Sequence, residues 1–190
     1  MSLKQPFEPI SFFETIVENN DAAIEEYSGI IDDLKEKNIL RLDQEETSNI
    51  TTDYFTNPEE WEYKMGLHVP FCNKYLGDHV RKFLKAKDTP EGTFTDIWTQ
   101  ITNGFQMHHP HTHGDVGYSF IWYIDVDEDE HEGTYFYAPY AGTGGNIEDY
   151  QIELQKGQLV IFPSWILHYQ PPSDSKVDRY IISGNIETSE

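Results

Sequence analysis

The chain has 190 residues, which is enough for one compact domain with a real core. Aromatic residues make up 14% of it and the mean hydropathy is −0.62, which favours a well-filled core beneath a very polar surface. A nucleic-acid backbone and an anionic membrane are both disfavoured as partners, because the net charge of −21 would repel them. Any anionic ligand must be held by a few local cations, since the chain has only 13 lysines and arginines.

The cellular location is suggested by cysteine usage and by the first residues. Cys72 is the single cysteine and cannot form an internal disulfide, which fits a reducing compartment. The first ten residues lack the apolar stretch of a signal peptide, and no apolar run approaches the ~20 residues that span a bilayer. We therefore expect a cytoplasmic protein.

The first half of the chain predicts two helices. Residues 19–38 have acids in the early turns and apolar residues at helical spacing: Ile24, Tyr27, Ile30, Ile31 and Leu34. Residues 39–66 show no sustained period and are expected to be irregular. A second amphipathic helix is expected to follow Pro70. Residues 1–92 are thus predicted to be a helical support region packed on the rest of a single domain.

The second half predicts strands. Short β-rich segments separated by turns cover residues 93–102, 117–126, 133–139, 150–154, 157–163, 166–170 and 179–186. The fold class is therefore mainly β with N-terminal helices, and short strands without intervening helices favour a sandwich or barrel. The aromatic, glycine-containing stretch 133–146 could form a flexible lid over its mouth.

One stretch, HHPHTHGDVGYS at 108–119, suggests a metal site. Side chains two residues apart in a strand share a face, so His111, His113 and Asp115 would point the same way. His109 would join them only if the strand began earlier, which Pro110 disfavours. Two histidines and one carboxylate are a donor set of non-haem Fe(II) oxygenases. The alternative is a polar loop that happens to be rich in histidine.

Two distal segments add to this hypothesis. In GQLVIFPSWILHYQ (157–170), an apolar strand and a tight turn lead to His168, which a neighbouring strand could bring to the first cluster. In RYIISGNI (179–186), Arg179 shares a face with Ser183. A guanidinium on an apolar strand is costly to bury without an anionic partner, and it can grip a carboxylate with two hydrogen bonds. The alternative for Arg179 is a surface salt bridge.

The ordered set HTH, SFIWY, FPSWILH and RYIISGN resembles the 2-oxoglutarate/Fe(II)-dependent dioxygenase superfamily over roughly residues 93–186. The likeness is greatest to a small bacterial and phage branch with an H-x-H…H…R pattern. The resemblance implies a double-stranded β-helix, a jelly-roll or cupin-like barrel, with residues 93–190 as its catalytic core. It implies Fe(II), the cosubstrate 2-oxoglutarate and O2, and hydroxylation of an amino-acid, peptide or small-molecule substrate with release of succinate and CO2.

The resemblance also implies roles for individual residues. His168 would be the distal iron ligand, and Arg179, aided by Ser183, would hold the far carboxylate of 2-oxoglutarate. Tyr123 would direct its hydroxyl at that same carboxylate.

Two metal triads remain open. The H-x-D pattern of the superfamily gives His113, Asp115 and His168, whereas the H-x-H pattern of the nearest branch gives His111, His113 and His168. The remaining member would contact a ligand or the substrate. The other histidines are expected at the rim of the site (His108 and His109) or on the surface (His68, His79 and His131).

Two other functions compete with this hypothesis. A cupin-type metal-binding protein or isomerase shares the barrel, and the offset from Pro163 to His168 matches its second motif. However, Trp165 stands where that motif wants glycine, its first-motif glutamate is missing, and a cupin does not need Arg179. The third possibility is a metal-free structural β-domain.

Overall fold

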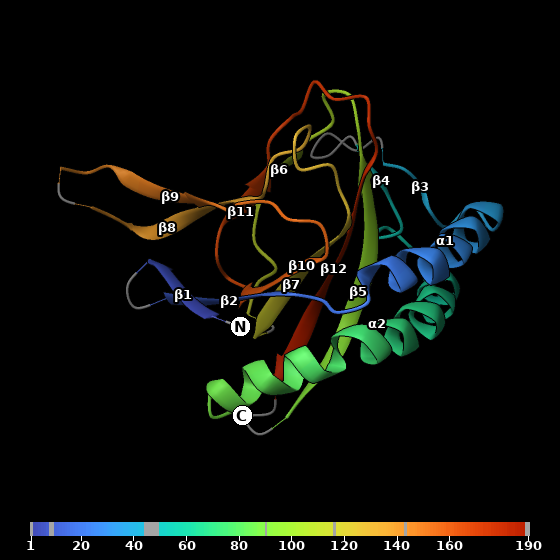
Figure 1. Cartoon of the computed structure of the whole chain (residues 1–190), viewed down its shortest axis with the longest axis horizontal. Coiled ribbons are helices and arrows are strands. Elements are labelled where there is room, and N and C mark those ends of the chain that lie inside the picture. Colours follow the sequence, from blue (N-terminus) through green and yellow to red (C-terminus); the bar gives the residue numbers. More distant parts are fainter. Residues whose placement is uncertain are drawn as a thin grey trace.

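The computed structural model describes residues 10–43, 50–89, 91–115, 117–142 and 144–188, together with the backbone of residues 2–7. It has two antiparallel sheets and two helices, and Figure 1 shows the sheets facing each other at one end. The chain is therefore mainly β with helices that precede most of the strands, as the sequence predicts.

The large sheet contains strands from both halves of the chain. In spatial order it consists of β1 (Ser2–Phe7), β2 (Ile10–Ile16), β10 (Gln158–Pro163), β7 (Tyr118–Asp125), β12 (Arg179–Thr188), β5 (Gly92–Thr102), β4 (Thr51–Thr52) and β3 (Arg41–Leu42). The small sheet consists of β6 (His108–His111), β11 (His168–Gln170), β8 (Tyr135–Ala141) and β9 (Ile147–Gln151). The β8–β9 hairpin, which the sequence suggests as a lid, projects from the body of the protein (Figure 1).

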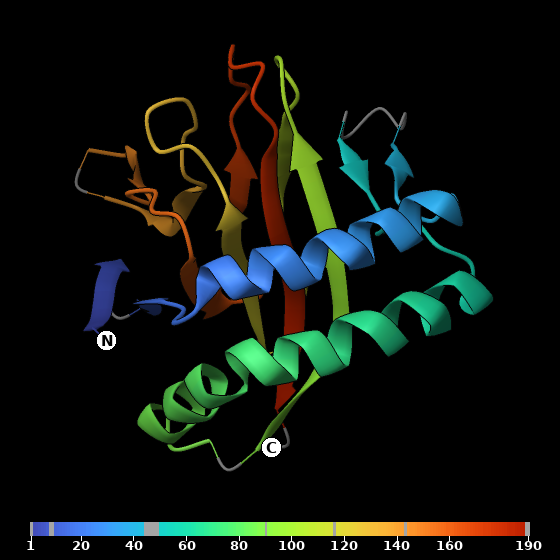
Figure 2. The ribbon, with the colours of Figure 1, turned by 45° about the vertical axis from the view of Figure 1, so that its right-hand side comes forward.

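The helices α1 (Asn20–Glu36) and α2 (Pro58–Ala86) lie across one face of the large sheet (Figure 2). The first agrees with the sequence prediction, but the second begins twelve residues before Pro70, which lies inside it. Asn57 and Glu60 form a capping box, and Pro58 takes the first helical position, where its missing N–H is not needed. Neither helix has both the length and the apolar composition that crossing a membrane requires.

The N-terminal segment is not purely helical, because β2 pairs with β10 and so extends the large sheet. Its neighbouring residues Phe12 and Phe13 are fully buried on opposite faces, one inside the barrel and the other under the helices. A strand buried on both faces lacks the alternation of apolar and polar residues that identifies a strand in sequence. The expectation of a support region made of helices therefore missed these strands.

Two apolar cores lie on either side of the large sheet. In β7, Phe120 and Trp122 face the helices, whereas Ile121 and Tyr123 face the small sheet. The same alternation in β12 sends Ile182 toward the helices and Ile181 toward the small sheet. The space between the two sheets is where side chains from β7, β12 and the small sheet meet.

A buried polar network joins the helices to β5. The Asp53 carboxylate accepts hydrogen bonds from His68 Nε2 at 2.7 Å and from the Thr99 backbone N–H at 2.6 Å. Lys64 Nζ donates to the Asp53 carbonyl oxygen at 3.0 Å. The side chains of Asp53, Lys64 and His68 are all fully buried. The expected surface position of His68 is wrong, because its helix face packs on the sheet.

The surface prediction is also wrong for His131, which is 7% exposed. Its Nδ1 accepts from the Asp127 backbone N–H at 3.0 Å, and its Nε2 donates to the Val177 carbonyl at 3.0 Å. His79 is half-buried. Histidine carries no strong preference for burial, so composition and spacing alone do not place it.

We expect Asp53→Ala to lower the free energy of unfolding by about 3 kcal/mol or more, because it leaves buried donors without an acceptor. Lys156→Ala removes the exposed ion pair with Asp125 and should cost less than about 1 kcal/mol. Urea unfolding of both variants measures the difference. Equal losses would show that the network does not hold the helices to the sheet.

Candidate metal centre

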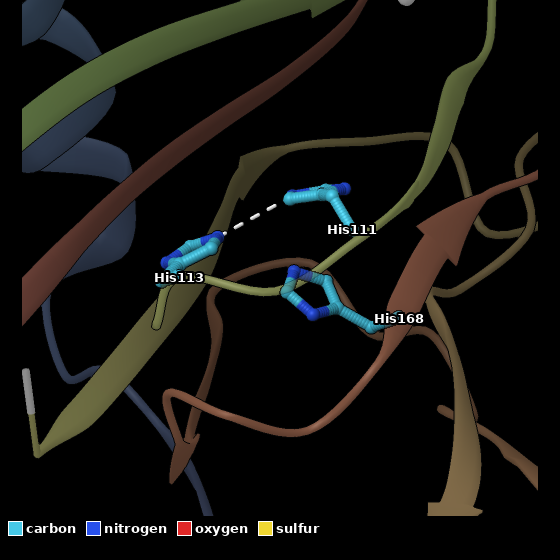
Figure 3. A group of neighbouring side chains, drawn as sticks. All are labelled: His111, His113 and His168. Atoms are coloured by element: carbon cyan, nitrogen blue, oxygen red, sulfur yellow. Dashed lines mark hydrogen bonds between the residues drawn. The ribbon is translucent and has the colours of Figure 1, made fainter. Parts of the chain in front are cut away.

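Three histidines come together where the two sheets face each other. His111 ends β6, His113 follows two residues later, and His168 begins β11 directly opposite His111 in the antiparallel pair. The ring centroids of His111 and His168 are 4.3 Å apart, and those of His113 and His168 are 5.0 Å apart. Figure 3 shows the three rings turned toward one another, and one nitrogen from each lies within 4.8 Å of the other two.

Hydrogen bonds to Nδ1 decide which ring nitrogen carries the proton. His111 Nδ1 lies 2.7 Å from the His109 carbonyl, and His168 Nδ1 lies 2.9 Å from the Ile166 carbonyl. Carbonyl oxygens only accept, so both Nδ1 atoms donate and both Nε2 atoms keep a free lone pair. His113 Nδ1 is within 2.9 Å of the Asn185 amide oxygen, which has the same effect.

The free lone pairs converge. His111 Nε2 and His113 Nε2 are 3.3 Å apart with no proton between them, which is unfavourable unless a cation lies nearby. Burial lowers the pKa of His113 to about 4 and that of His168 well below its usual value, so both rings are neutral near pH 7. Three neutral imidazoles with oriented lone pairs fit a divalent first-row metal ion.

The structure treats the two open triads differently. His113 and His168 are common to both, and His111 joins them, whereas Asp115 is exposed and is not part of the group among the described residues. The tight turn after His113 contains Gly114 at a φ of 79°, so residues 113 and 115 are not in an extended strand. The two-residue alternation of a strand predicts Asp115 on the same strand face as His111 and His113. In the structure the extended strand ends before Asp115, so this face does not include it.

Arg179 is the second unusual feature. It is 2% exposed, and its Nε and Nη2 atoms have no hydrogen-bond partner within the described structure. Burial lowers the pKa of its guanidinium to about 10, which still leaves it charged near pH 7. Its Cζ lies 5.1 Å from the centre of the Tyr123 ring, and the ion pairs of the described residues do not include it. Two buried N–H groups of one cation call for an anionic acceptor.

The space from the histidines to Arg179 is a row of cavities. An outer pocket of about 350 Å³ and an inner cavity of about 20 Å³ share five lining residues: Trp98, Gln100, His108, His111 and His113. The inner cavity also touches His168 and Ser183. Gln170 lines both this cavity and the next one, which reaches Arg179.

The structure places Tyr123 against Arg179, but its hydroxyl is already engaged. Tyr123 donates to Thr134 Oγ1 at 2.9 Å and accepts from the Thr134 backbone N–H at 3.2 Å. Its contact with Arg179 is through the face of the ring.

Sequence reasoning missed two residues of the site, Asn185 and Gln100, and placed a third, His108, at its rim without a role. Asn185 orients His113, and Gln100 donates from its side-chain amide to His108 Nδ1 at 2.8 Å. His108 stacks on His111 with ring centroids 3.9 Å apart and lines both inner and outer cavities. The two-residue alternation of β12 could have pointed to Asn185, since it shares the face of Arg179 and Ser183.

The family that the chain resembles is found by comparison as well. Residues 96–185 match the model of a family described as "Putative 2OG-Fe(II) oxygenase". This segment contains the three histidines and Arg179. No curated protein has a sequence similar enough to count as a match. The match and the histidine cluster agree with the enzyme class expected from the sequence, that of 2-oxoglutarate/Fe(II)-dependent dioxygenases, which use Fe(II), 2-oxoglutarate and O2.

Solved structures agree in fold. A prolyl-4-hydroxylase from Pseudomonas putida aligns with a TM-score of 0.63 at 12% identity, over 96% of this chain and 95% of that one. The collagen prolyl hydroxylase of Paramecium Bursaria Chlorella virus-1, in complex with 2-oxoglutarate, gives 0.56 at 16% identity, over 94% and 96%. The α-ketoglutarate-dependent epimerase SnoN of nogalamycin biosynthesis gives 0.59 at 10% identity, over 93% and 76%. The expected double-stranded β-helix is thereby confirmed.

We expect His111→Ala to weaken binding of Mn(II) or Co(II) by about 100-fold or more, because it removes one of three converging lone pairs. Asp115→Ala should leave the affinity unchanged within about twofold, since that carboxylate is exposed outside the cluster. Anaerobic isothermal titration of both variants measures the two affinities. The reverse result would assign the metal to His113, Asp115 and His168.

Proposed function

We propose that the chain is an Fe(II)- and 2-oxoglutarate-dependent oxygenase whose metal is held by His111, His113 and His168. When bound, the iron would supply the oxidising chemistry with O2 as the oxidant, one oxygen atom going into the succinate formed with CO2 from 2-oxoglutarate and the other into the substrate. The observation that carries the proposal is the pairing of converging imidazole lone pairs with a buried, unsatisfied guanidinium, joined by a row of cavities.

The residues around the three histidines support this ligand set. Asn185 accepts from His113 Nδ1, and carbonyl oxygens accept from the other two rings, so that each ring is fixed in orientation and tautomer. Neutral ligands do not offset the charge of a divalent ion. The carboxylate of 2-oxoglutarate nearer the metal would supply the negative charge that the H-x-D triad takes from aspartate.

Arg179 would bind the far carboxylate of 2-oxoglutarate through its unsatisfied Nε and Nη2 atoms. Ser183 lies on the same face of β12 nearer the histidines and would offer a hydroxyl along the cosubstrate. The face of the Tyr123 ring would hold the guanidinium of Arg179 in place by a cation–π contact. The Tyr123 hydroxyl is hydrogen-bonded to Thr134 instead.

Hydroxylation of an amino-acid, peptide or small-molecule substrate is the reaction that we propose. Two of the similar structures are named as prolyl hydroxylases, one of them a collagen enzyme, which supports a peptide substrate. A third is named as an epimerase, so the fold alone does not decide the outcome of the oxidation.

We also propose that residues 93–190 form the catalytic core and that residues 1–92 support it. All proposed ligands lie after residue 107, which supports this division. The first region contributes the helices that cover the large sheet and the strands at its edges.

Titration separates this function from the two alternatives. An oxygenase should develop weak visible absorbance on anaerobic addition of Fe(II) and 2-oxoglutarate together, and should release succinate in air. A cupin should respond to metal alone, and a metal-free structural domain should respond to neither. A response to metal without any effect of 2-oxoglutarate would overturn the proposal.

We expect Arg179→Ala to weaken 2-oxoglutarate binding by about 100-fold, because two charge-assisted hydrogen bonds are lost, while metal affinity stays unchanged. Arg179→Lys keeps the positive charge but lacks the two parallel N–H donors of a guanidinium. Its affinity for 2-oxoglutarate should therefore lie between those of the wild type and Arg179→Ala. The measurement is the visible absorbance of the Fe(II) protein as 2-oxoglutarate is added without oxygen.

A stability control accompanies this series. Removing a buried guanidinium whose Nε and Nη2 atoms lack hydrogen-bond partners should not lower the free energy of unfolding of the ligand-free protein, and a folded Arg179→Ala variant is expected. Equal 2-oxoglutarate affinity in the wild type and the folded variant would exclude the proposed role.

A further inference from the structure

The outer pocket beside His111 and His113 has an aromatic wall. The Trp98 ring lies 5.3 Å from that of His113, Tyr54 packs against Trp98 at 5.0 Å, and Phe55 packs against Tyr54 at 5.0 Å. These three rings lead outward from the proposed metal position, and all line the pocket. Such a wall favours contact with an apolar group.

The described lining of the pocket also lacks charged side chains of lysine, arginine, aspartate or glutamate, although such residues make up 25% of the chain. Lys64 lies 5.9 Å from the centre of the Tyr54 ring, but it is fully buried and pairs with Asp96 at 3.3 Å. A charged group entering this pocket would therefore lose water without gaining an ionic partner among the described side chains that line it.

His108 is a polar residue of the pocket lining whose ring is held by hydrogen bonding and stacking. The Gln100 amide nitrogen donates to His108 Nδ1, so the proton of the neutral ring sits on Nε2. The stacking of His108 on His111 holds the ring in place. His108 thus offers an N–H from a position directly beside a proposed metal ligand, in a pocket that is otherwise mostly apolar.

We propose that the outer pocket binds an uncharged, largely apolar group of the substrate that is flanked by an amide carbonyl, and that His108 donates to this carbonyl. The inference rests on the proposed function, since the pocket serves the metal site. In this proposal His108 contacts the substrate, whereas Arg179 binds 2-oxoglutarate. A free amino acid, with a charged carboxylate beside its side chain, is disfavoured relative to the same residue within a chain.

The probes for the test are three matched compounds. N-acetyl-leucinamide is neutral, N-acetyl-leucine carries a carboxylate in place of the amide, and N-acetyl-lysinamide carries a cation on the side chain. The protein is loaded with Zn(II) and 2-oxoglutarate, which keeps it diamagnetic and stops turnover. Binding is followed by NMR on the Trp98 indole N–H, with the exposed Trp165 indole as the control.

The neutral compound should shift the Trp98 signal and leave the Trp165 signal unchanged. Each charged compound should bind with an affinity at least about tenfold lower than that of the neutral compound. Two variants test the donor. His108→Phe keeps a ring but removes the N–H, and should weaken the neutral compound about fivefold, whereas His108→Gln keeps an N–H donor and should restore most of the affinity.

Three outcomes would overturn the inference: a carboxylate that binds as tightly as the amide, equal amide affinity in His108→Phe and the wild type, or a loss of 2-oxoglutarate affinity in His108→Phe. The last would assign His108 to the cosubstrate. Repeating the titration without metal and 2-oxoglutarate separates this inference from the proposed function. If neither the metal nor 2-oxoglutarate binds, but N-acetyl-leucinamide still binds in this pocket and depends on His108, only the oxygenase proposal fails.

Discussion

The register of β12 is the constraint on which the site depends. This strand pairs with β5 on one side and β7 on the other, and its alternation sends Arg179, Ser183 and Asn185 toward the small sheet. Ile182 and Ile186 on the other face pack under the helices. A slip of one residue would turn the guanidinium into the helix core and remove the amide that orients His113. The apolar face of one strand therefore fixes both ends of the proposed cosubstrate site.

Burial has opposite consequences for the two kinds of base in this site. It removes the charge of the imidazoles, whose ordinary pKa lies near neutrality, and so leaves their lone pairs available. It only lowers the pKa of Arg179 to about 10, and the guanidinium stays charged. The same dry interior thus creates a cation-binding end and an anion-binding end. The described metal-binding group contains no carboxylate, although the net charge of the chain is −21, whereas Glu132 is among the residues that line the cavity reaching Arg179.

The sequence was sufficient where a pattern reflects one local rule. Apart from β6, the strands after residue 92, the H-x-H stretch, His168 and Arg179 follow from alternation, turns and spacing, and the structure brings the histidines together. Strand β6 begins at His108 and runs through Pro110, where the sequence disfavoured a strand. It was insufficient where long-range packing decides. The strand around Phe12 and Phe13 is buried on both faces, His68 is paired from a distant loop, and His108 acquires its role through Gln100 on another strand. The sequence left the triads with Asp115 and with His111 equally open, because the turn at Gly114, which ends the extended face before Asp115, cannot be read from the spacing alone.

The N-terminal half also shapes the site, because it determines how β5 presents its inner face. Asp53 binds the Thr99 backbone N–H, and Thr52 donates to the Thr99 carbonyl at 2.7 Å. Thr99 thereby faces the helices, and the residues on either side of it, Trp98 and Gln100, face the proposed metal centre. Tyr54 follows directly after Asp53 and completes the aromatic wall. The buried network between helix and strand is therefore the means by which residues far from the histidines position the walls of the pocket beside them.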